Sequence, residues 1–307
     1  MITFTRVLCP IDFSETSGKA LAHAAAVAQW HDAALTLLHA APSFDPIHLQ
    51  TGGLADPVRV VQTPTRAQVE HELRRMADQA GIPENRLTVV TVEGDAAAVV
   101  LDEAVARQAS LIVLGTHGRS GFDRVLLGSV TEKVLRKAPC PVLTVPPHST
   151  ATRAAEVAVT RILCPMDYSA AALQALGFAL AIGRQRHAHV TVLQVIEWLA
   201  EEEPRATAHF NVAEYRRALV DDAHERLRAL ITEAAPGRSG IGDAVVIGRA
   251  HREIVRTATS TGTDLIVMGA QGRGAVGTAL FGSATQHVVR TAECPVLTVR
   301  GVPAASA

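Results

Sequence analysis

The chain contains the same set of short sequence blocks twice. VLCPIDFS at 7–14 returns as ILCPMDYS at 162–169, and LIVLGTHGR at 111–119 returns as LIVMGAQGR at 265–273. A third block, APCPVLTV at 138–145, returns as AECPVLTV at 292–299. The copies are offset by 154 or 155 residues, so the spacing between the blocks is kept. Such self-similarity predicts one domain repeated in tandem. We expect a first domain at 1–148, a linker at 149–158 and a second domain at 159–301.

Each half alternates short apolar runs with helical patterns, which is typical of parallel βαβ units. The fold class predicted is α/β, with two tandem doubly wound domains, each a five-stranded parallel sheet of order 3-2-1-4-5 flanked by helices. Expected strands in the first half are 6–12, 35–41, 87–93, 111–115 and 141–145, and expected helices are 14–31, 65–81, 95–108 and 129–137. Expected strands in the second half are 161–167, 189–196, 243–248, 264–269 and 295–299. Long divergent segments at 42–64 and 197–210 are expected to form surface loops over a site.

Charge and hydropathy exclude several classes of protein. With 29 basic and 30 acidic residues and 4% aromatic residues, the chain lacks the overall basic field and the stacking side chains of a nucleic-acid-binding protein. No apolar stretch approaches the roughly 18–20 residues that span a bilayer, and the N-terminus reads as a strand rather than a signal peptide. A cytoplasmic protein without a membrane partner is therefore expected. The four cysteines are expected to be small buried thiols rather than disulfide partners or metal ligands.

Glycines follow the fourth expected strand of each half in a repeated spacing. Gly115, Gly118 and Gly128 precede Ser129 in the first half, and Gly269, Gly272 and Gly282 precede Ser283 in the second. In the order 3-2-1-4-5 the ligand crevice opens between strands one and four, so the acids that end the first strands, Asp12 and Asp167, should face these glycines. The helix that starts after each glycine segment offers free N–H groups to an anion. SVTE and SATQ at these helix starts also match a capping box, which predicts that Ser129 and Ser283 are helix caps.

Other ligand motifs fit this sequence poorly. Residues 272–277 spell GxGxxG, but the segment starts three residues after a strand, and the first half does not keep it. Gly18-Lys19 is followed by Ala20, so it is no phosphate-binding P-loop. There are thirteen histidines but no HExxH, and His117 is replaced by Gln271 in the second half. We therefore predict no metal site and no catalytic residue.

The combination of CPIDFS, the spacing G-x2-G-x9-G-[ST] and CPVLTV resembles the universal stress protein family, over nearly the whole chain and in a tandem form. In nucleotide-binding members, the glycine pattern holds the ribose and phosphates of ATP, the acid lies at the adenosine end, and a residue ending the second strand lies against adenine. The resemblance implies the cofactor-binding residues Asp12, Ala40, Gly115, Gly118, Gly128, Ser129 and Val130, and Asp167, Val195, Gly269, Gly272, Gly282, Ser283 and Ala284. Ala284 departs from the family pattern that Val130 keeps. Arg119 and Arg273 follow the second glycine and are candidates to pair with phosphate, or are solvated surface arginines.

The function implied is an ATP-binding regulatory protein of the stress response with little or no turnover. A carboxylate repels phosphate, so Asp12 and Asp167 should accept hydrogen bonds at the nucleoside end, while Mg²⁺ is compatible with the phosphate end. Two alternatives stay open: a slow ATPase or autophosphorylating enzyme, and a structural stress module that no longer binds nucleotide. Neither the stress signal nor the protein partner is indicated by the sequence.

The fifth strand of each half predicts how the halves meet. In the order 3-2-1-4-5 this strand is a sheet edge, and CPVLTV is apolar and uncharged, so its free N–H and C=O groups invite pairing. Antiparallel pairing of 141–145 with 295–299 about a pseudo-two-fold axis would satisfy both edges within one chain, much as universal stress proteins do when they form a homodimer. The alternative is an ordinary fifth strand covered by its own helices.

Overall fold

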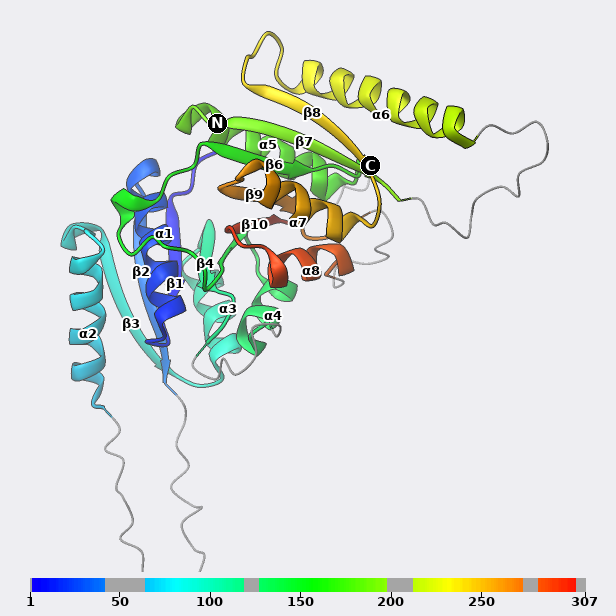
Figure 1. The fold of residues 1–307 in the computed structure, drawn as a ribbon. Coiled ribbons are helices and arrows are strands. Elements are labelled where there is room, and N and C mark those ends of the chain that lie inside the picture. Colours follow the sequence, from blue (N-terminus) through cyan, green and yellow to red (C-terminus); the bar gives the residue numbers. More distant parts are fainter. Residues whose placement is uncertain (1, 42–63, 119–126, 198–211, 273–280, 302–307) are drawn as a thin grey trace, which may run out of the picture.

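The computed structural model describes residues 2–41, 64–118, 127–197, 212–272 and 281–301. Helices and strands alternate through both halves (Figure 1). The first half consists of β1 (Arg6–Pro10), α1 (Glu15–His31), β2 (Ala34–Ala41), α2 (Arg66–Gln79), β3 (Leu87–Glu93), α3 (Ala96–Ala106), β4 (Leu111–Gly115), α4 (Ser129–Lys137) and β5 (Val142–Val145). The second half consists of β6 (Arg161–Pro165), α5 (Ala170–Arg186), β7 (His189–Ile196), α6 (Val212–Ala234), β8 (Ile241–Ile247), α7 (Ala250–Thr261), β9 (Leu265–Gly269), α8 (Ser283–Thr291) and β10 (Val296–Val299).

The predicted sheet order is confirmed in both halves. The described strands form one ten-stranded sheet of order β3-β2-β1-β4-β5-β10-β9-β6-β7-β8, which contains the order 3-2-1-4-5 twice. All neighbours within a half are parallel. The expected first strands were too long by two residues, because β1 ends at Pro10 and β6 at Pro165. The aspartates therefore lie in the turn that leaves each strand.

The two halves join through their fifth strands. β5 and β10 pair in antiparallel register, with Leu143 opposite Leu297 and Thr144 opposite Val296. Thr144 Oγ1 donates to the Val296 carbonyl and Thr298 Oγ1 donates to the Val142 carbonyl, both at 3.2 Å, and both threonines are buried. The hydroxyl groups thus repeat one contact on either side of a pseudo-two-fold axis.

Side chains away from the sheet also link the halves. The Arg186 guanidinium lies over the Trp30 ring, 4.3 Å from its centroid, and Phe4 stacks on Phe178 at 5.8 Å. Arg300, which follows β10, donates to the Leu135 carbonyl at 3.2 Å, at the C-terminal end of α4. A cation at that end of a helix is stabilised by the unpaired carbonyls. These side-chain contacts therefore hold the two halves together in addition to the pairing of β5 with β10.

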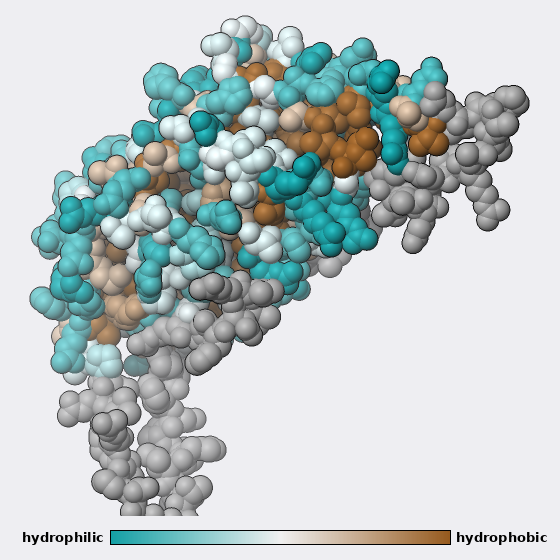
Figure 2. Space-filling model, in the orientation of Figure 1, coloured by the Kyte–Doolittle hydropathy of each residue, from teal (hydrophilic) through white to brown (hydrophobic). Residues whose placement is uncertain are grey.

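Hydrophobic cores lie on both faces of the sheet. On one face the strands pack with α1, α2, α5 and α6, and on the other with α3, α4, α7 and α8. Alternation along β1 shows why both faces need cover, since Val7 and Cys9 enter one core and Leu8 enters the other. Figure 2 shows a described surface that is mainly hydrophilic, with apolar areas between the polar ones. No helix of the described ranges is long and apolar enough to cross a membrane.

The four thiols are free. Cys9 and Cys164 are buried in β1 and β6, while Cys140 and Cys294, expected to be buried, are only half-buried. Burial raises the pKa of the Cys164 thiol to about 12, which keeps it protonated and unreactive at neutral pH.

Burial of His23 in α1 predicts a loss of stability in acid. Its Nε2 lies 2.9 Å from Ser149 Oγ, and desolvation lowers its pKa from 6.5 to about 4. Because the folded chain resists protonation that the unfolded chain accepts, the stability contributed by neutral His23 is complete above pH 6.5 and is lost as the pH falls toward 4. At pH 5 we expect a loss of about 2 kcal/mol relative to pH 7.5.

His23→Gln isolates this effect, because glutamine keeps a hydrogen-bonding group for Ser149 but does not titrate. Urea unfolding at pH 7.5 and pH 5 should show a smaller acid loss in the variant than in the parent chain. An equal loss in both proteins would contradict the assignment to His23.

Candidate functional site

Equivalent residues lie where strands one and four end in both halves. β1 pairs with β4, and β6 pairs with β9, in parallel register. Their carboxyl ends therefore lie at the same edge of the sheet, where the chain continues to Asp12 in the first half and to Asp167 in the second. The acids and the glycine segments consequently meet at one place in each half.

A left-handed residue shapes the turn after each acid. Phe13 and Tyr168 both have a φ of 62°, which is rare for a side chain of this size. In the first half, the Ser14 N–H and Ser14 Oγ donate to Asp12 Oδ1, at 3.0 and 2.6 Å. In the second half, the Ser169 N–H donates to Asp167 Oδ1 at 3.0 Å. The turn thus fixes one carboxylate oxygen and sets the orientation of the other.

The second carboxylate oxygen lies against the second glycine of the pattern. A Cβ atom added to Gly118 would lie 2.9 Å from Asp12 Oδ2, and one added to Gly272 would lie 2.9 Å from Asp167 Oδ2. Neither glycine has a positive φ, so the conformation of the backbone does not require glycine there. Glycine fits there because any side chain would have to displace the carboxylate oxygen.

The first glycine of the pattern has a different structural reason. A Cβ at Gly115 would lie 2.6 Å from Thr16 Cγ2, and one at Gly269 would lie 2.9 Å from Ala171 Cβ. Thr16 and Ala171 are in the first turns of α1 and α5. These glycines let the first turns of α1 and α5 pack closely on the ends of β4 and β9, which brings the N-termini of α1 and α5 toward the crevice.

The predicted serine caps are wrong. Gly128 and Gly282 are the N-caps of α4 and α8, without a side-chain hydrogen bond, and Ser129 and Ser283 are the first helical residues. The Gly128 N–H instead donates to the Thr116 carbonyl, and the Gly282 N–H to the Ala270 carbonyl, both at 2.9 Å. Ser129 and Ser283 are exposed. Solvent therefore reaches both serines at the start of a helix, where the first N–H groups have no acceptor within the helix and favour an anion.

Thr131 and Thr285, which the sequence reasoning missed, tie each helix to its strand. Thr131 Oγ1 donates to the Gly115 carbonyl at 2.8 Å, and Thr285 Oγ1 donates to the Gly269 carbonyl at 2.9 Å. Both threonines are buried. The signal in the sequence was the threonine two residues after the serine in SVT and SAT, which both halves keep.

A cavity of about 430 Å³ occupies the crevice of the second half. Every second-half candidate within the described ranges lines it: Asp167, Val195, Gly269, Gly272, Gly282, Ser283 and Ala284. Its walls also include residues that the sequence reasoning did not select, among them Met166, Leu193, Ala250, Ile254, Gln271 and Phe281. The cavity combines apolar walls with one carboxylate and the first residues of α7 and α8, which suits a ligand with an apolar and an anionic end.

The first-half candidates occupy matching places in their own half. Ala40 in β2 pairs with Val92, as Val195 in β7 pairs with Val246. Ala40 and Val130 are half-buried and pack on the core face that also contains Leu127. Arg119 and Arg273 lie outside the described residues.

The histidine of the first-half glycine segment, His117, has a lowered pKa. His117 Nδ1 lies 2.9 Å from Thr116 Oγ1, and burial together with the nearby His148 lowers the pKa of His117. Gln271 stands in its place in the second half and lines the cavity. No group of three or more metal-ligating side chains occurs among the described residues.

Comparison with known proteins agrees with the repeated architecture. The model of the universal stress protein family matches residues 3–146 and again residues 158–300. A universal stress protein of Mycolicibacterium smegmatis is 25% identical over 301 residues, which cover 96% of both chains. A universal stress protein of Thermus aquaticus is 33% identical over 143 residues, covering 46% of this chain and 98% of the relative. The crystal structure of a universal stress protein from Archaeoglobus fulgidus covers 98% of both chains, with a TM-score of 0.64 and 20% identity.

The family match spans both halves and nearly the whole length of the chain. The sheet order agrees with the doubly wound fold that the sequence predicted for each half. The chain belongs to the universal stress protein family and contains two tandem copies of its domain.

Proposed function

We propose that this protein binds ATP in both halves and acts as a nucleotide-dependent regulator in a stress response, with little or no turnover. The observation that carries the proposal is that, in both halves, an aspartate carboxylate lies against the second glycine of the pattern. In the second half this pair lines a cavity of about 430 Å³. Such a cavity is within the range of small-molecule sites. We further propose that the binding units are the domains 1–148 and 159–301, joined by the linker 149–158.

The chemistry of the walls sets the direction in which ATP lies. Leu193, Val195 and Ile254 offer apolar surface to an adenine ring, and Asp167 offers acceptor oxygens to ribose hydroxyls. The start of α8 offers N–H groups and the Ser283 hydroxyl to phosphate. The carboxylate and the phosphates are then at different ends of the ligand, which avoids repulsion between them.

The residues proposed to bind ATP are those that the resemblance implied, together with Arg119 and Arg273, the candidates to pair with phosphate. In the first half they are Asp12, Ala40, Gly115, Gly118, Arg119, Gly128, Ser129 and Val130. In the second half they are Asp167, Val195, Gly269, Gly272, Arg273, Gly282, Ser283 and Ala284. Mg²⁺ bound with ATP would be held mainly by the phosphates and by water.

The test of this orientation is the removal of each acid. A hydrogen bond to a charged group is worth about 1.5–3 kcal/mol, which is roughly 10- to 150-fold in affinity. Asp12→Ala and Asp167→Ala should weaken ATP binding at their own half by that factor, measured by calorimetry. Asp102→Ala, at an exposed position of α3, is the control and should leave ATP affinity unchanged.

Tighter binding in either site variant would mean that the carboxylate faces the phosphates, and the orientation proposed for ATP would be reversed. Unchanged affinity in both variants would mean that the acids do not contact the nucleotide.

A further inference from the structure

The two crevices differ in the charge around their helix starts. In each half the last two helices are neighbours, α3 and α4 in the first half and α7 and α8 in the second (Figure 1). Ala250 of α7 and Ser283 of α8 both line the second cavity, so the side chains next to them lie close to its mouth. Differences between the halves at these positions therefore bear on which ligand each half prefers.

In the first half the charges at these positions are balanced. Lys133 pairs with Asp95 at 3.5 Å, and Arg136 pairs with Glu132 at 2.7 Å. Asp95 also caps α3 by accepting the Ala98 N–H at 3.0 Å. An approaching anion meets no excess of positive charge here.

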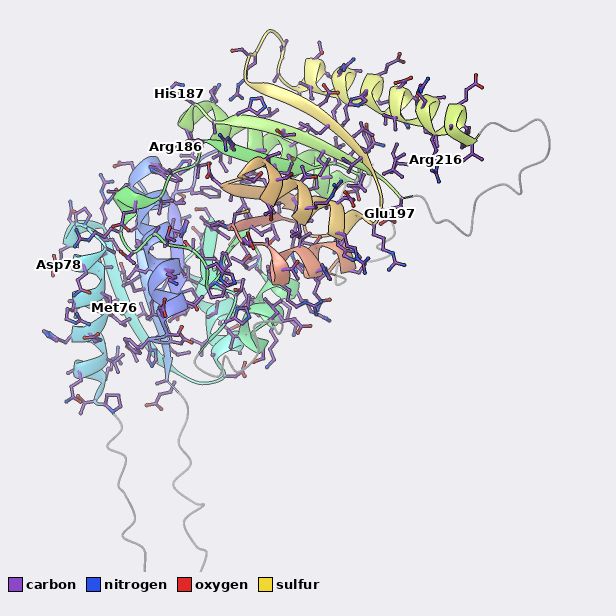
Figure 3. The ribbon with its side chains drawn as sticks, in the orientation of Figure 1. Met76, Asp78, Arg186, His187, Glu197 and Arg216 are labelled. Atoms are coloured by element: carbon purple, nitrogen blue, oxygen red, sulfur yellow. The ribbon has the colours of Figure 1, made fainter. Side chains whose placement is uncertain are left out.

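In the second half the acids are replaced. Arg249 stands where the first half has Asp95, and Gln286 stands where it has Glu132. Arg252 replaces Ala98, while Arg290 matches Arg136. Glu197, labelled in Figure 3, follows β7 and accepts the Ala250 N–H at 3.0 Å, so the capping acid comes from another element.

Two histidines complete this set, which we name the basic rim: Arg249, His251, Arg252, His287 and Arg290. The His251 and His287 rings lie 4.2 Å apart between α7 and α8, and Arg290 Nη2 lies 3.3 Å from His287 Nδ1. Burial lowers the pKa of His287, and so do the charges of His251, Arg290 and Arg252. The arginines and histidines of the basic rim are thus near enough to act on one another, and the charges of Arg252 and Arg290 favour the neutral form of His287.

Two described acids lie beside the basic rim at the start of α7: Glu197, which accepts the Ala250 N–H, and Glu253. Neither Arg249 nor Arg252 forms an ion pair with a described acid, and Glu253 is paired with Arg256 at 2.5 Å. Arg249 and Arg252 are both exposed, so they do not serve the core. Their charge remains available to a ligand at the cavity mouth.

We infer that the basic rim makes the second half the site selective for polyphosphate nucleotides, whereas the first half distinguishes less between charged and uncharged adenine ligands. This inference rests on the proposed function, because it assigns a preference to the same site. A charge about one Debye length from a polyphosphate changes its affinity by a few-fold at moderate salt. The affinity for uncharged adenosine should not depend on the basic rim.

The experiment uses the full chain with one site disabled. Gly118→Val leaves the second site to be measured, and Gly272→Val leaves the first. Calorimetry with ATP and with adenosine, at low and high salt, should show ATP binding that is about tenfold tighter and more salt-sensitive at the second site.

Exchanging residues between the halves identifies the cause. Arg249→Asp with Arg252→Ala gives the second half the residues of the first, and should weaken ATP there about tenfold while adenosine affinity stays the same. Arg249→Asn is the control for capping, because asparagine can cap α7 without adding a negative charge. It should cause a smaller loss than Arg249→Asp.

The outcomes separate the two proposals. Equal ATP affinity and equal salt dependence at the two sites would overturn the role of the basic rim and leave the proposed function standing. Loss of adenosine and ATP affinity together in the exchange variant would also overturn it, because the residues would then act through structure rather than charge. Absence of ATP binding at both sites would overturn the proposed function and this inference with it.

Discussion

Gly118→Val and Gly272→Val should each abolish ATP binding at their own half while the chain stays folded. A Cβ atom at either position would lie 2.9 Å from a carboxylate oxygen, which is closer than real Cβ contacts. Valine would therefore displace Asp12 or Asp167 and fill the space that the ribose of ATP needs. We expect affinity to fall by about 100-fold or more at that half, combining the lost hydrogen bond with steric exclusion.

The matched control is Gly18→Ala, because nothing lies within 4 Å of a Cβ at Gly18 in α1. That variant should bind ATP as the parent chain does. Thermal unfolding of all three variants checks that the fold is kept, which we expect because Gly118 is exposed and Gly272 is only half-buried. Unchanged ATP affinity in a chain carrying both valines would show that these crevices are not nucleotide sites.

The isolated first half, residues 1–149, should form a homodimer. In the whole chain β5 pairs with β10, and Thr144 is fully buried at that junction. Removing the second half exposes the edge of β5 and the apolar surface around it, both of which favour association. A second copy of β5 can replace β10, because the two strands share the sequence VLTV.

Sedimentation at several protein concentrations measures this directly. Thr144→Lys is the control, because dimerisation would bury a charge next to each copy of the strand, and this fragment should stay monomeric. A folded parent fragment that stays monomeric at high concentration would show that β5 needs its own partner strand, and the pairing would not be interchangeable.

The order of helices and strands could be predicted from the sequence. Their bounds were wrongly predicted next to a glycine or a rare backbone conformation. β8 begins at Ile241, two residues before the predicted start, because Gly242 takes a regular place in the ladder opposite Thr191. Glycine disfavours strands, so the pattern gave no reason to include it. The turn at Phe13 could not be predicted from the sequence either, because a positive φ is rare for phenylalanine.

The site was predictable where it rests on repeated motifs. Asp167 was selected because it ends the predicted first strand of its half and Gly272 because of the glycine spacing, and the structure brings them together. Ala250 and Ile254 were missed because α7 reaches the cavity through the sheet topology and carries no motif of its own. The serine caps were wrongly predicted because a glycine directly before each serine adopts the capping conformation instead.

The most direct test of the account is the number of ATP molecules that the full, folded chain binds. Equilibrium dialysis against saturating ATP, followed by quantification of nucleotide and protein, should give two molecules per chain. Gly118→Val and Gly272→Val should each reduce this number to one, and the double variant should reduce it to none. A folded parent chain that retains no ATP at saturation would contradict the central claim that the duplicated crevices are nucleotide sites.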